Sequence, residues 1–364
     1  MTDLPIKCGV VQLVPRRADR YDGIGDYATL LAHAMLERAG ANSVFVVGTP
    51  ARIEPPRADR WQTNPVRHRT GSRLAKQLSE LCCEKDASAV IVHVSGYGYE
   101  KRGAPIWLLR GMRIWRRKHS NCQLFGIFHE LFATGRVWNS SFWLSKLQEH
   151  ITRGIWELCD GGLATTSRYF EQLASWRPHM KGSLFIMPVF SNVGEPNLIV
   201  PIQNRPPNMV VFGQPGVERR VYTGPGYEWA ASIVENLQIQ KIIDVGARRD
   251  IPPDRVGRVP VLSLGPLSPN CVSQQLMSCQ FGLLDYDIGR LEKSSVFAAY
   301  AAHGVIPVCI GAQANPPHGL EEGRHFLRWP LQKLPDCGAI QRNLVDWYSG
   351  HSIRKHADLL SSFK

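Results

Sequence analysis

Short apolar runs alternate with amphipathic segments through the first half of the chain. A continuous apolar run such as IKCGVVQLV (6–14) is typical of a strand buried on both faces, and apolar positions spaced three or four apart indicate helices. We expect strands over 6–14, 42–48, 88–95, 123–130, 161–167 and 183–189. We expect helices over 26–38, 71–85, 104–119, 140–159 and 168–176. Strands that alternate with helices predict a parallel, doubly wound sheet.

The second half repeats this alternation after PIQNRPPN (201–208), which we interpret as a linker because it is rich in Pro and Asn. Residues 50–70, rich in Pro and Arg, are expected to form a loop. The expected strands are 209–213, 241–246, 260–265, 280–286 and 305–310. The expected helices are 226–237, 269–278 and 294–303, followed by a helical tail over 343–363.

Two such halves predict an α/β chain with two Rossmann-like domains that face each other across a cleft. We place an N-terminal, acceptor-binding domain at 1–201 and a C-terminal, nucleotide-sugar-binding domain at 202–340. A C-terminal helix at 341–364 is expected to pack back on the first domain. In sheets of this kind, ligands bind at the carboxyl ends of the strands, so we searched those ends for polar residues.

Charge favours an anionic partner. The 364 residues carry a net +12, of which +9 falls in residues 1–200. Membrane headgroups, a phosphorylated substrate and nucleic acid all fit this excess. No apolar run approaches the roughly 18–20 residues that span a bilayer. The N-terminus lacks the charged, then apolar, then small residues of a secretory signal, so we expect a cytoplasmic protein. Nine scattered Cys lack metal-binding spacing, and we expect reduced thiols and no metal.

A basic group precedes a predicted helix in LEKSSVFAAYAAHGVIPV (291–308). Unpaired N–H groups at a helix start bind phosphate, Ser294 and Ser295 add hydroxyls, and Lys293 adds a charge. An ordinary serine N-cap explains the same residues. We expect Glu292 beside them to contact the nucleotide sugar.

Other strand ends supply further candidates for the same site. Arg219 and Arg220 follow strand 209–213. One guanidinium group can bind two phosphate oxygens at once, and a solvated arginine in a loop is the alternative interpretation of each residue. Gly265, Pro266 and Leu267, at the end of strand 260–265, are expected to line the donor site.

Two glycines, Gly23 and Gly25, precede the first helix in DGIGDYA (22–28) and would let the backbone approach a ligand. The segment matches Gly-x-Gly-x-x-Ala, but the loop from Val14 to Gly23 is too long for a dinucleotide-binding turn, and no acidic residue ends strand 42–48 to hold a ribose. A purely conformational turn is the alternative.

A polar pair, His129-Glu130, ends strand 123–130. The histidine is a candidate to hydrogen-bond a sugar hydroxyl or take a proton, with a packed histidine as the alternative. In the neighbouring HVSGYGY (93–99), Tyr97 and Tyr99 are suited to stacking on sugar rings or to packing within the loop. We expect both tyrosines and Glu130 to contact the acceptor.

The helix PIWLLRGMRIWRRKH (105–119) is basic and contains two tryptophans. It is suited to an anionic membrane surface, and an ordinary amphipathic helix that covers the sheet is the alternative. We favour sheet packing, and keep peripheral association with the inner face of the cytoplasmic membrane as a second expectation.

Over nearly its whole length the chain resembles GT-B glycosyltransferases, close to the large retaining group called family 4. The segments that carry the resemblance are GIGDYATLLAHAM (23–35), HVSGYGY (93–99), FHELFATG (128–135), TTSRYFEQL (165–173) and the block FGLLDY to HGVIPV (281–308). The resemblance implies a glycine-rich loop near the donor diphosphate, a histidine beside the transferred sugar and a nucleotide-sugar site in the last block.

The last block departs from the family pattern. Two glutamates separated by seven residues would fall at Leu291 and Ala299, and Glu292 lies one place from the first. The helix start that usually reads Gly-Phe-Gly-Leu is Lys293-Ser294-Ser295-Val296 here.

The function expected from the sequence is transfer of a sugar from a nucleotide-diphosphate donor to a glycan, polysaccharide or lipid-linked hydroxyl acceptor. His129, Arg219, Arg220 and Lys293 are the candidate catalytic residues, and the resemblance favours retention of configuration. No metal or other cofactor is expected, because fixed cations would stabilise the leaving diphosphate. The alternatives are a nucleotide-sugar epimerase of the same fold, an inactive partner in a transferase complex and a nucleic-acid binder.

Overall fold

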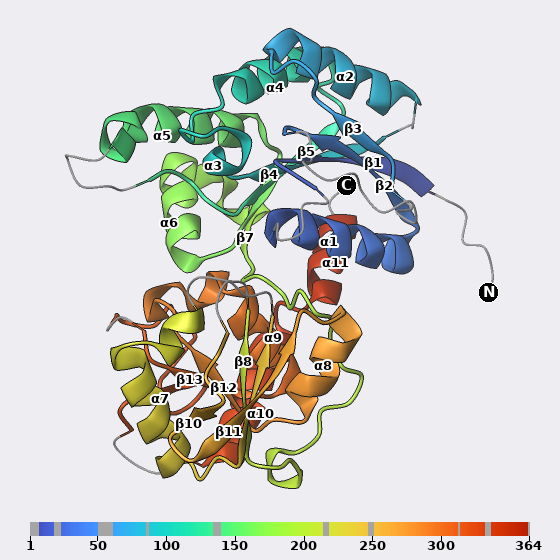
Figure 1. Cartoon of the computed structure of the whole chain (residues 1–364). Helices are drawn as coiled ribbons and strands as arrows, with labels where there is room; N and C mark the ends of the chain where they lie inside the picture. Colours follow the sequence, from blue (N-terminus) through green and yellow to red (C-terminus); the bar gives the residue numbers. More distant parts are fainter. Residues whose placement is uncertain are drawn as a thin grey trace. The chain divides into compact units, whose positions relative to one another are not determined.

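The computed structural model describes residues 7–17, 23–49, 61–84, 87–133, 140–213, 218–246, 251–311, 314–331 and 336–362. The chain divides into two compact units. The first comprises Met1–Pro188 and Ile353–Lys364, and the second comprises Val189–Ser352. Each unit is built around one seven-stranded sheet with helices on both faces (Figure 1), so the predicted fold class, two Rossmann-like α/β domains, is confirmed.

The sheet of the first unit has the strand order β3-β2-β1-β4-β5-β6-β7, and all its pairs are parallel. The central strands are buried because their apolar runs lie between two helical layers. The strands are β1 (Lys7–Val14), β2 (Ala41–Val47), β3 (Thr63–Pro65), β4 (Ala89–Val94), β5 (Gln123–Phe128), β6 (Gly161–Ala164) and β7 (Leu184–Ile186).

Alternate residues of these strands pack against different helical layers. Val11, Leu13 and Val92 belong to the larger apolar cluster, which includes side chains of α2 (Gly71–Glu84), α4 (Ile106–Lys118) and α5 (Ser140–Leu158). Val14 and Phe45 pack with residues of α1 (Gly23–Ala39), so α1 covers the opposite face (Figure 1). The short α3 (Gly96–Tyr99) and α6 (Ser167–Trp176) complete this unit together with α11 (Ile353–Ser362).

The second unit has the strand order β10-β11-β9-β8-β12-β13-β14, in which only the β10–β11 pair is antiparallel among the described strands. The strands are β8 (Asn208–Phe212), β9 (Lys241–Val245), β10 (Arg255–Val256), β11 (Val259–Gly265), β12 (Phe281–Leu284), β13 (Ile306–Cys309) and β14 (Leu327–Arg328). The helices are α7 (Pro225–Asn236), α8 (Pro269–Met277), α9 (Ser295–His303) and α10 (Cys337–Ser349).

The units divide at Pro188/Val189, whereas the sequence analysis placed the boundary at 201/202. The segment 201–208, interpreted as a linker, is held inside the second unit. Arg205 is buried and donates hydrogen bonds to the carbonyl oxygens of Val200, Cys279 and His303. These bonds tie the segment to the rest of the unit in spite of its Pro-rich composition.

The predicted helical tail consists of two helices that belong to different units. Helix α10 is part of the second unit, and α11 is part of the first, where Asp358 accepts a hydrogen bond from Arg38 of α1 at 2.9 Å. In the described part of the chain, every helix is too short or too polar to cross a lipid bilayer.

Candidate functional site

A row of buried polar side chains crosses the first sheet on the face that α1 covers. Gln12 is aligned with Phe45 of β2, and His93 of β4 with Ile127 of β5. Because side chains alternate between faces, Ser43, Gln12, His93 and His129 all point to the same face, and the last two lie nearest the carboxyl edge. All four are buried.

Hydrogen bonds connect this row into one chain. Gln12 Nε2 donates to Ser43 Oγ at 2.9 Å, and Gln12 Oε1 lies 3.1 Å from His93 Nε2. His93 Nδ1 lies 3.1 Å from His129 Nε2, and the two rings are nearly parallel, at 10°. His129 therefore ends a chain whose other members, Ser43, Gln12 and His93, come from three different strands.

Burial keeps His93, the middle histidine of this chain, electrically neutral. Loss of solvent lowers the pKa of His93 to about 3, because the protonated ring would be a charge in an apolar interior. Tyr27 of α1 packs its ring edge-on against His129, with ring centroids 4.9 Å apart, and burial raises the pKa of its hydroxyl. His93 and Tyr27, which both pack against His129, are thus uncharged at neutral pH.

Glu130 follows His129 and is oriented by a neighbouring strand. Ser95 Oγ donates to Glu130 Oε2 at 2.7 Å, and Val94 O accepts from the backbone N–H groups of both His129 and Glu130. The structure therefore brings the predicted pair to one place at the carboxyl ends of β4 and β5. Its part in binding an acceptor stays a prediction.

The two tyrosines of HVSGYGY differ in their surroundings. Tyr97 is exposed and its hydroxyl accepts from Gln148 Nε2 at 3.1 Å, so it stays a candidate for acceptor contact. Tyr99 is buried, donates to Leu13 O at 2.9 Å and fills the space that Gly48 leaves open. The prediction that Tyr99 contacts an acceptor is wrong for this structure, because its ring packs in the core.

The two glycines of the first segment begin α1 at the same face of the sheet. Gly23 is exposed, and a side chain added there would meet no neighbouring atom, so packing does not require a glycine. Gly25 is buried, and its carbonyl oxygen accepts from Thr29 Oγ1 at 2.8 Å. Their role at a diphosphate stays a prediction, and residue 22 lies outside the described residues.

At the corresponding edge of the second sheet, the ends of β8 and β12 carry charges. Arg220, in the 3₁₀ helix η3 (Glu218–Tyr222), lies 2.9 Å from the Asp285 carboxylate that follows β12. Burial raises the pKa of Asp285 although the Arg220 charge opposes this. The side chain of Arg219 lies outside the described residues.

The segment between β12 and α9 contains the remaining basic candidates. It forms the 3₁₀ helix η4 (Ile288–Lys293), and Asp287 is the N-cap of this helix. The Asp287 carboxylate also forms an ion pair with Arg290 at 3.3 Å. Lys293 is half-buried at the end of η4, and Glu292 before it is buried. Ser294 is the N-cap of α9, and its hydroxyl oxygen accepts a hydrogen bond from the Phe297 N–H at 3.1 Å. The cap explains Ser294 structurally. Ser295 opens the helix and is half-buried.

The remaining donor-site candidates lie two strands away from β8. Gly265 ends β11 with a positive φ of 69°, a conformation that favours glycine, and Pro266 and Leu267 follow it. Ala299, where the family pattern has a glutamate, is fully buried on α9. A glutamate side chain there would have no room to reach a ligand without displacing its neighbours.

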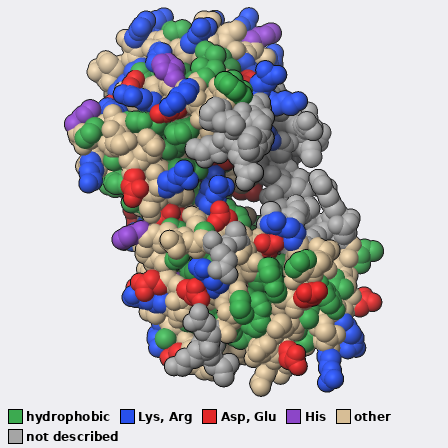
Figure 2. Space-filling model, turned by 90° about the vertical axis from the view of Figure 1, so that its left-hand side faces the viewer, with side chains coloured by type: hydrophobic (Ala, Val, Ile, Leu, Met, Phe, Trp, Pro, Cys, Tyr) green, Lys and Arg blue, Asp and Glu red, His purple; other side chains and the backbone are tan. Residues whose placement is uncertain are grey.

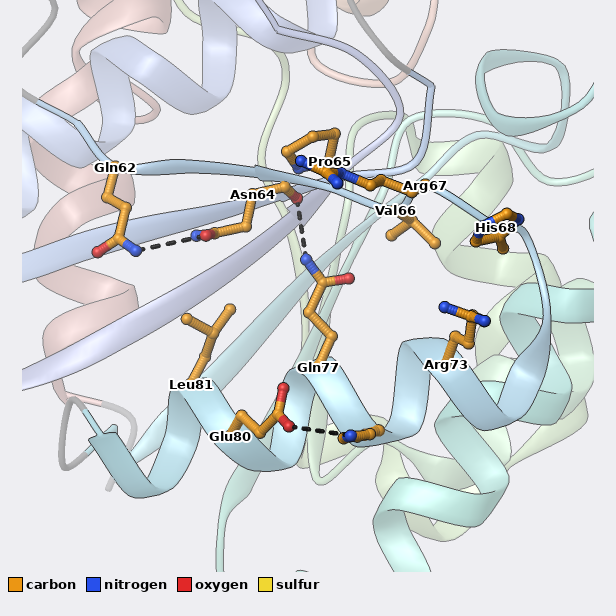
Figure 3. Close-up of a pocket in the computed structure, with 11 residues that line it drawn as sticks. Gln62, Asn64, Pro65, Val66, Arg67, His68, Arg73, Gln77, Glu80 and Leu81 are labelled. Carbon is orange, nitrogen blue, oxygen red and sulfur yellow. Dashed lines mark hydrogen bonds and ion pairs between the residues drawn. The ribbon is translucent and has the colours of Figure 1, made fainter.

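A pocket of about 510 Å³ opens between the edge strand β3 and α2 (Figure 3). The pocket lies on the α2 side of the sheet, whereas the His129 chain lies on the face that α1 covers, so the two are distinct. Arg67, Arg73 and Lys76 line it, and its single carboxylate, Glu80, pairs with Lys76 at 3.7 Å. The lining offers mainly hydrogen-bond donors and positive charge.

The basic helix α4 packs as a sheet-covering helix. Trp107 and Trp115 are buried in the first unit, whereas Arg110 and Arg117 are exposed. The tryptophans are therefore unavailable to a lipid surface. On the face drawn in Figure 2, Lys and Arg side chains are scattered, with Asp and Glu among them.

Several residues of the site were missed by the sequence analysis. Gln12, Ser43 and Tyr27 complete the buried row with His93 and His129. The signal was the single polar residue inside the apolar run VVQLV, since a buried amide must find hydrogen-bond partners.

The two seven-stranded units define a chain of the GT-B fold. No protein-family model matches the sequence, and no curated protein matches it either. The chain is similar in structure to the lipopolysaccharide outer core galactosyltransferase WaaB in its apo form, with a TM-score of 0.55 and 12% identity over 97% of this chain and 98% of that one. It is also similar to the UDP-GlcNAc 2-epimerase of Methanocaldococcus jannaschii, with a TM-score of 0.52 and 9% identity over 97% and 99% of the two chains.

Proposed function

We propose that this protein is a glycosyltransferase that moves a sugar from a nucleotide-diphosphate donor to a hydroxyl group of a glycan, polysaccharide or lipid-linked acceptor. The observation that carries the proposal is the buried chain that ends at His129. A histidine that is bonded through His93 to a chain of side chains from three strands is held in one position, and a positioned histidine at a strand end is suited to binding or proton transfer. The GT-B fold supports a nucleotide-sugar substrate.

The second unit is proposed to bind the nucleotide diphosphate. Arg220 and Lys293 would stabilise the charge that develops on the leaving phosphate, and the start of α9 would add backbone N–H groups. Because fixed cations take this role, we propose transfer without a metal ion. Full activity in EDTA is the expected result, and loss of activity that Mn²⁺ restores would contradict it.

The acceptor is proposed to carry anionic groups. This is supported by the pocket beside α2, where Arg67 and Arg73 have no ion-pair partner among the described residues. An acceptor with phosphate or carboxylate groups would be attracted to this surface. The family resemblance supports retention of configuration, and proton NMR of the first product would determine it.

A nucleotide-sugar epimerase is the second candidate, supported by the likeness in fold to the Methanocaldococcus jannaschii enzyme. The experiment that separates the two is incubation of nucleotide sugars with and without acceptor glycans. A transferase releases nucleoside diphosphate only in step with glycan product. Conversion of the sugar in the absence of any acceptor would favour the epimerase.

A further inference from the structure

We infer that Gln12 and His93 are positioning residues that hold His129 in the tautomer with its proton on Nε2. In that tautomer Nδ1 is the nitrogen that takes up a proton. The inference rests on the proposed function, in which His129 contacts the donor sugar or the acceptor, but the tautomer can be measured without any substrate.

The argument starts at the amide of Gln12. Its Nε2 donates to Ser43 Oγ, and its Oε1 lies 3.1 Å from His93 Nε2. An amide oxygen only accepts hydrogen bonds, so His93 Nε2 must carry the proton between them. The orientation of one amide group therefore determines the tautomer of His93.

The next step follows from the charge of His93. A neutral imidazole carries one N–H, and burial lowers the pKa of His93 to about 3, so its Nδ1 has a lone pair at neutral pH. That lone pair lies 3.1 Å from His129 Nε2. For a hydrogen bond to form there, His129 must be the donor, which places its proton on Nε2.

This arrangement suits proton transfer because it survives protonation of His129. When Nδ1 takes up a proton, Nε2 remains a donor to His93, so no bond of the chain breaks and the ring need not turn. Among the described residues, the titratable groups whose rings pack against His129 include His93 from β4 and Tyr27 from α1, and Glu130 follows His129 in the chain.

The second unit provides an internal reference with the opposite tautomer. His303 Nδ1 lies 2.8 Å from the carbonyl oxygen of Ala299, which only accepts, and His303 Nε2 lies 2.7 Å from Ser273 Oγ. By the same reasoning His303 carries its proton on Nδ1. The two histidines should therefore give distinguishable nitrogen spectra in one sample.

The experiment is long-range ¹H–¹⁵N NMR of the full chain labelled at histidine, at neutral pH and without substrate, with signals assigned by single substitutions. We expect His129 protonated on Nε2 and His303 protonated on Nδ1. In His93→Phe, which removes the acceptor, His129 should become a mixture of both tautomers. In His93→Asn, whose amide oxygen can take the place of Nδ1, the Nε2–H form should persist. The His303 signals report folding in each variant.

A proton on His129 Nδ1 in the wild type would overturn the inference, and that test needs no variant. An unchanged Nε2–H form in both His93→Phe and Gln12→Met would also overturn it, because the chain would then not set the tautomer. If the tautomers are as inferred but no nucleotide sugar is turned over, the proposed function fails and the positioning stands. If transfer occurs, His93→Phe should lower kcat about tenfold or more with a smaller change in KM.

Discussion

The carboxyl edges of the two sheets differ in burial and in charge. In the first unit, the end of β5 presents His129 at the end of a buried hydrogen-bonded chain, in which burial keeps His93 neutral. In the second unit, the end of β12 presents charged groups, among them Asp285 paired with Arg220. The same strand–helix alternation thus supports two kinds of site. A group held in a hydrogen-bonded chain is suited to proton transfer and sugar contact, and cationic side chains are suited to binding phosphate.

The largest effect that this contrast predicts is on turnover. His129→Ala should lower kcat by about 10²–10⁴-fold, the usual contribution of a positioned acid or base, and leave nucleotide binding within about twofold of the wild type. Initial rates of nucleoside diphosphate release, together with calorimetric titration of the nucleotide, would measure both. Loss of nucleotide binding with normal turnover would mean that the roles assigned to the two edges are exchanged.

The free energy of unfolding should decrease at acidic pH because two buried histidines, His93 and His303, are neutral in the folded chain. Burial lowers the pKa of His93 to about 3 and that of His303 to about 4. The unfolded chain, whose histidines titrate near 6.5, therefore binds more protons below that pH, and stability falls as the pH falls from about 6.5 toward these values. Each histidine contributes a loss of about 2 kcal/mol by pH 5.

Urea unfolding at pH 7.5 and pH 5.0 would measure this loss. His93→Phe should lose less stability on acidification than the wild type, although it is less stable at both pH values. An equal loss in the variant would show that His93 is not held neutral by the fold.

A smaller effect is expected at the charged edge. Lys293→Ala should weaken binding of a nucleoside diphosphate about tenfold, as expected for loss of one charge-assisted hydrogen bond. Arg255→Ala is the matched control, because Arg255 is an exposed cation of the same unit on β10, away from the end of β12. Calorimetric titration would compare them, and equal weakening in the two variants would indicate a general charge effect only.

The smallest effect is expected at the pocket beside α2. Arg73→Gln should raise KM for an anionic acceptor a few-fold at low salt and less at high salt, because the contact is exposed and screened. Arg110→Gln, which removes an exposed arginine of α4 outside the pocket, is the control. A KM that is the same for both variants and the wild type would place the acceptor elsewhere.

Much of the fold could be predicted from apolar runs, because parallel strands buried between helices have a strong sequence signal. The two-residue β14 and the three-residue β3 were not predicted, because such short edge strands contain no hydrophobic pattern of their own. The tail was predicted as one helix because its apolar spacing continues past Gly350, and only the structure assigns α10 and α11 to different units.

The site was less predictable. His129 and Glu130 could be selected because polar residues at the end of a buried strand are conspicuous. The partners of His129 could not, because Ser43, Gln12 and His93 come together only through the register of β2, β1, β4 and β5. Tyr99 was misjudged for a similar reason, since the space for its ring is provided by Gly48, far away in the sequence.

The central claim is that this chain binds a nucleotide diphosphate through its second unit. A thermal-shift screen of nucleoside diphosphates and nucleotide sugars tests it most directly. A ligand at 100 times its Kd should stabilise the protein by about 2.7 kcal/mol, and Lys293→Ala should need about tenfold more ligand for the same shift. No shift with any nucleotide, or an identical shift in Lys293→Ala and wild type, would contradict the account.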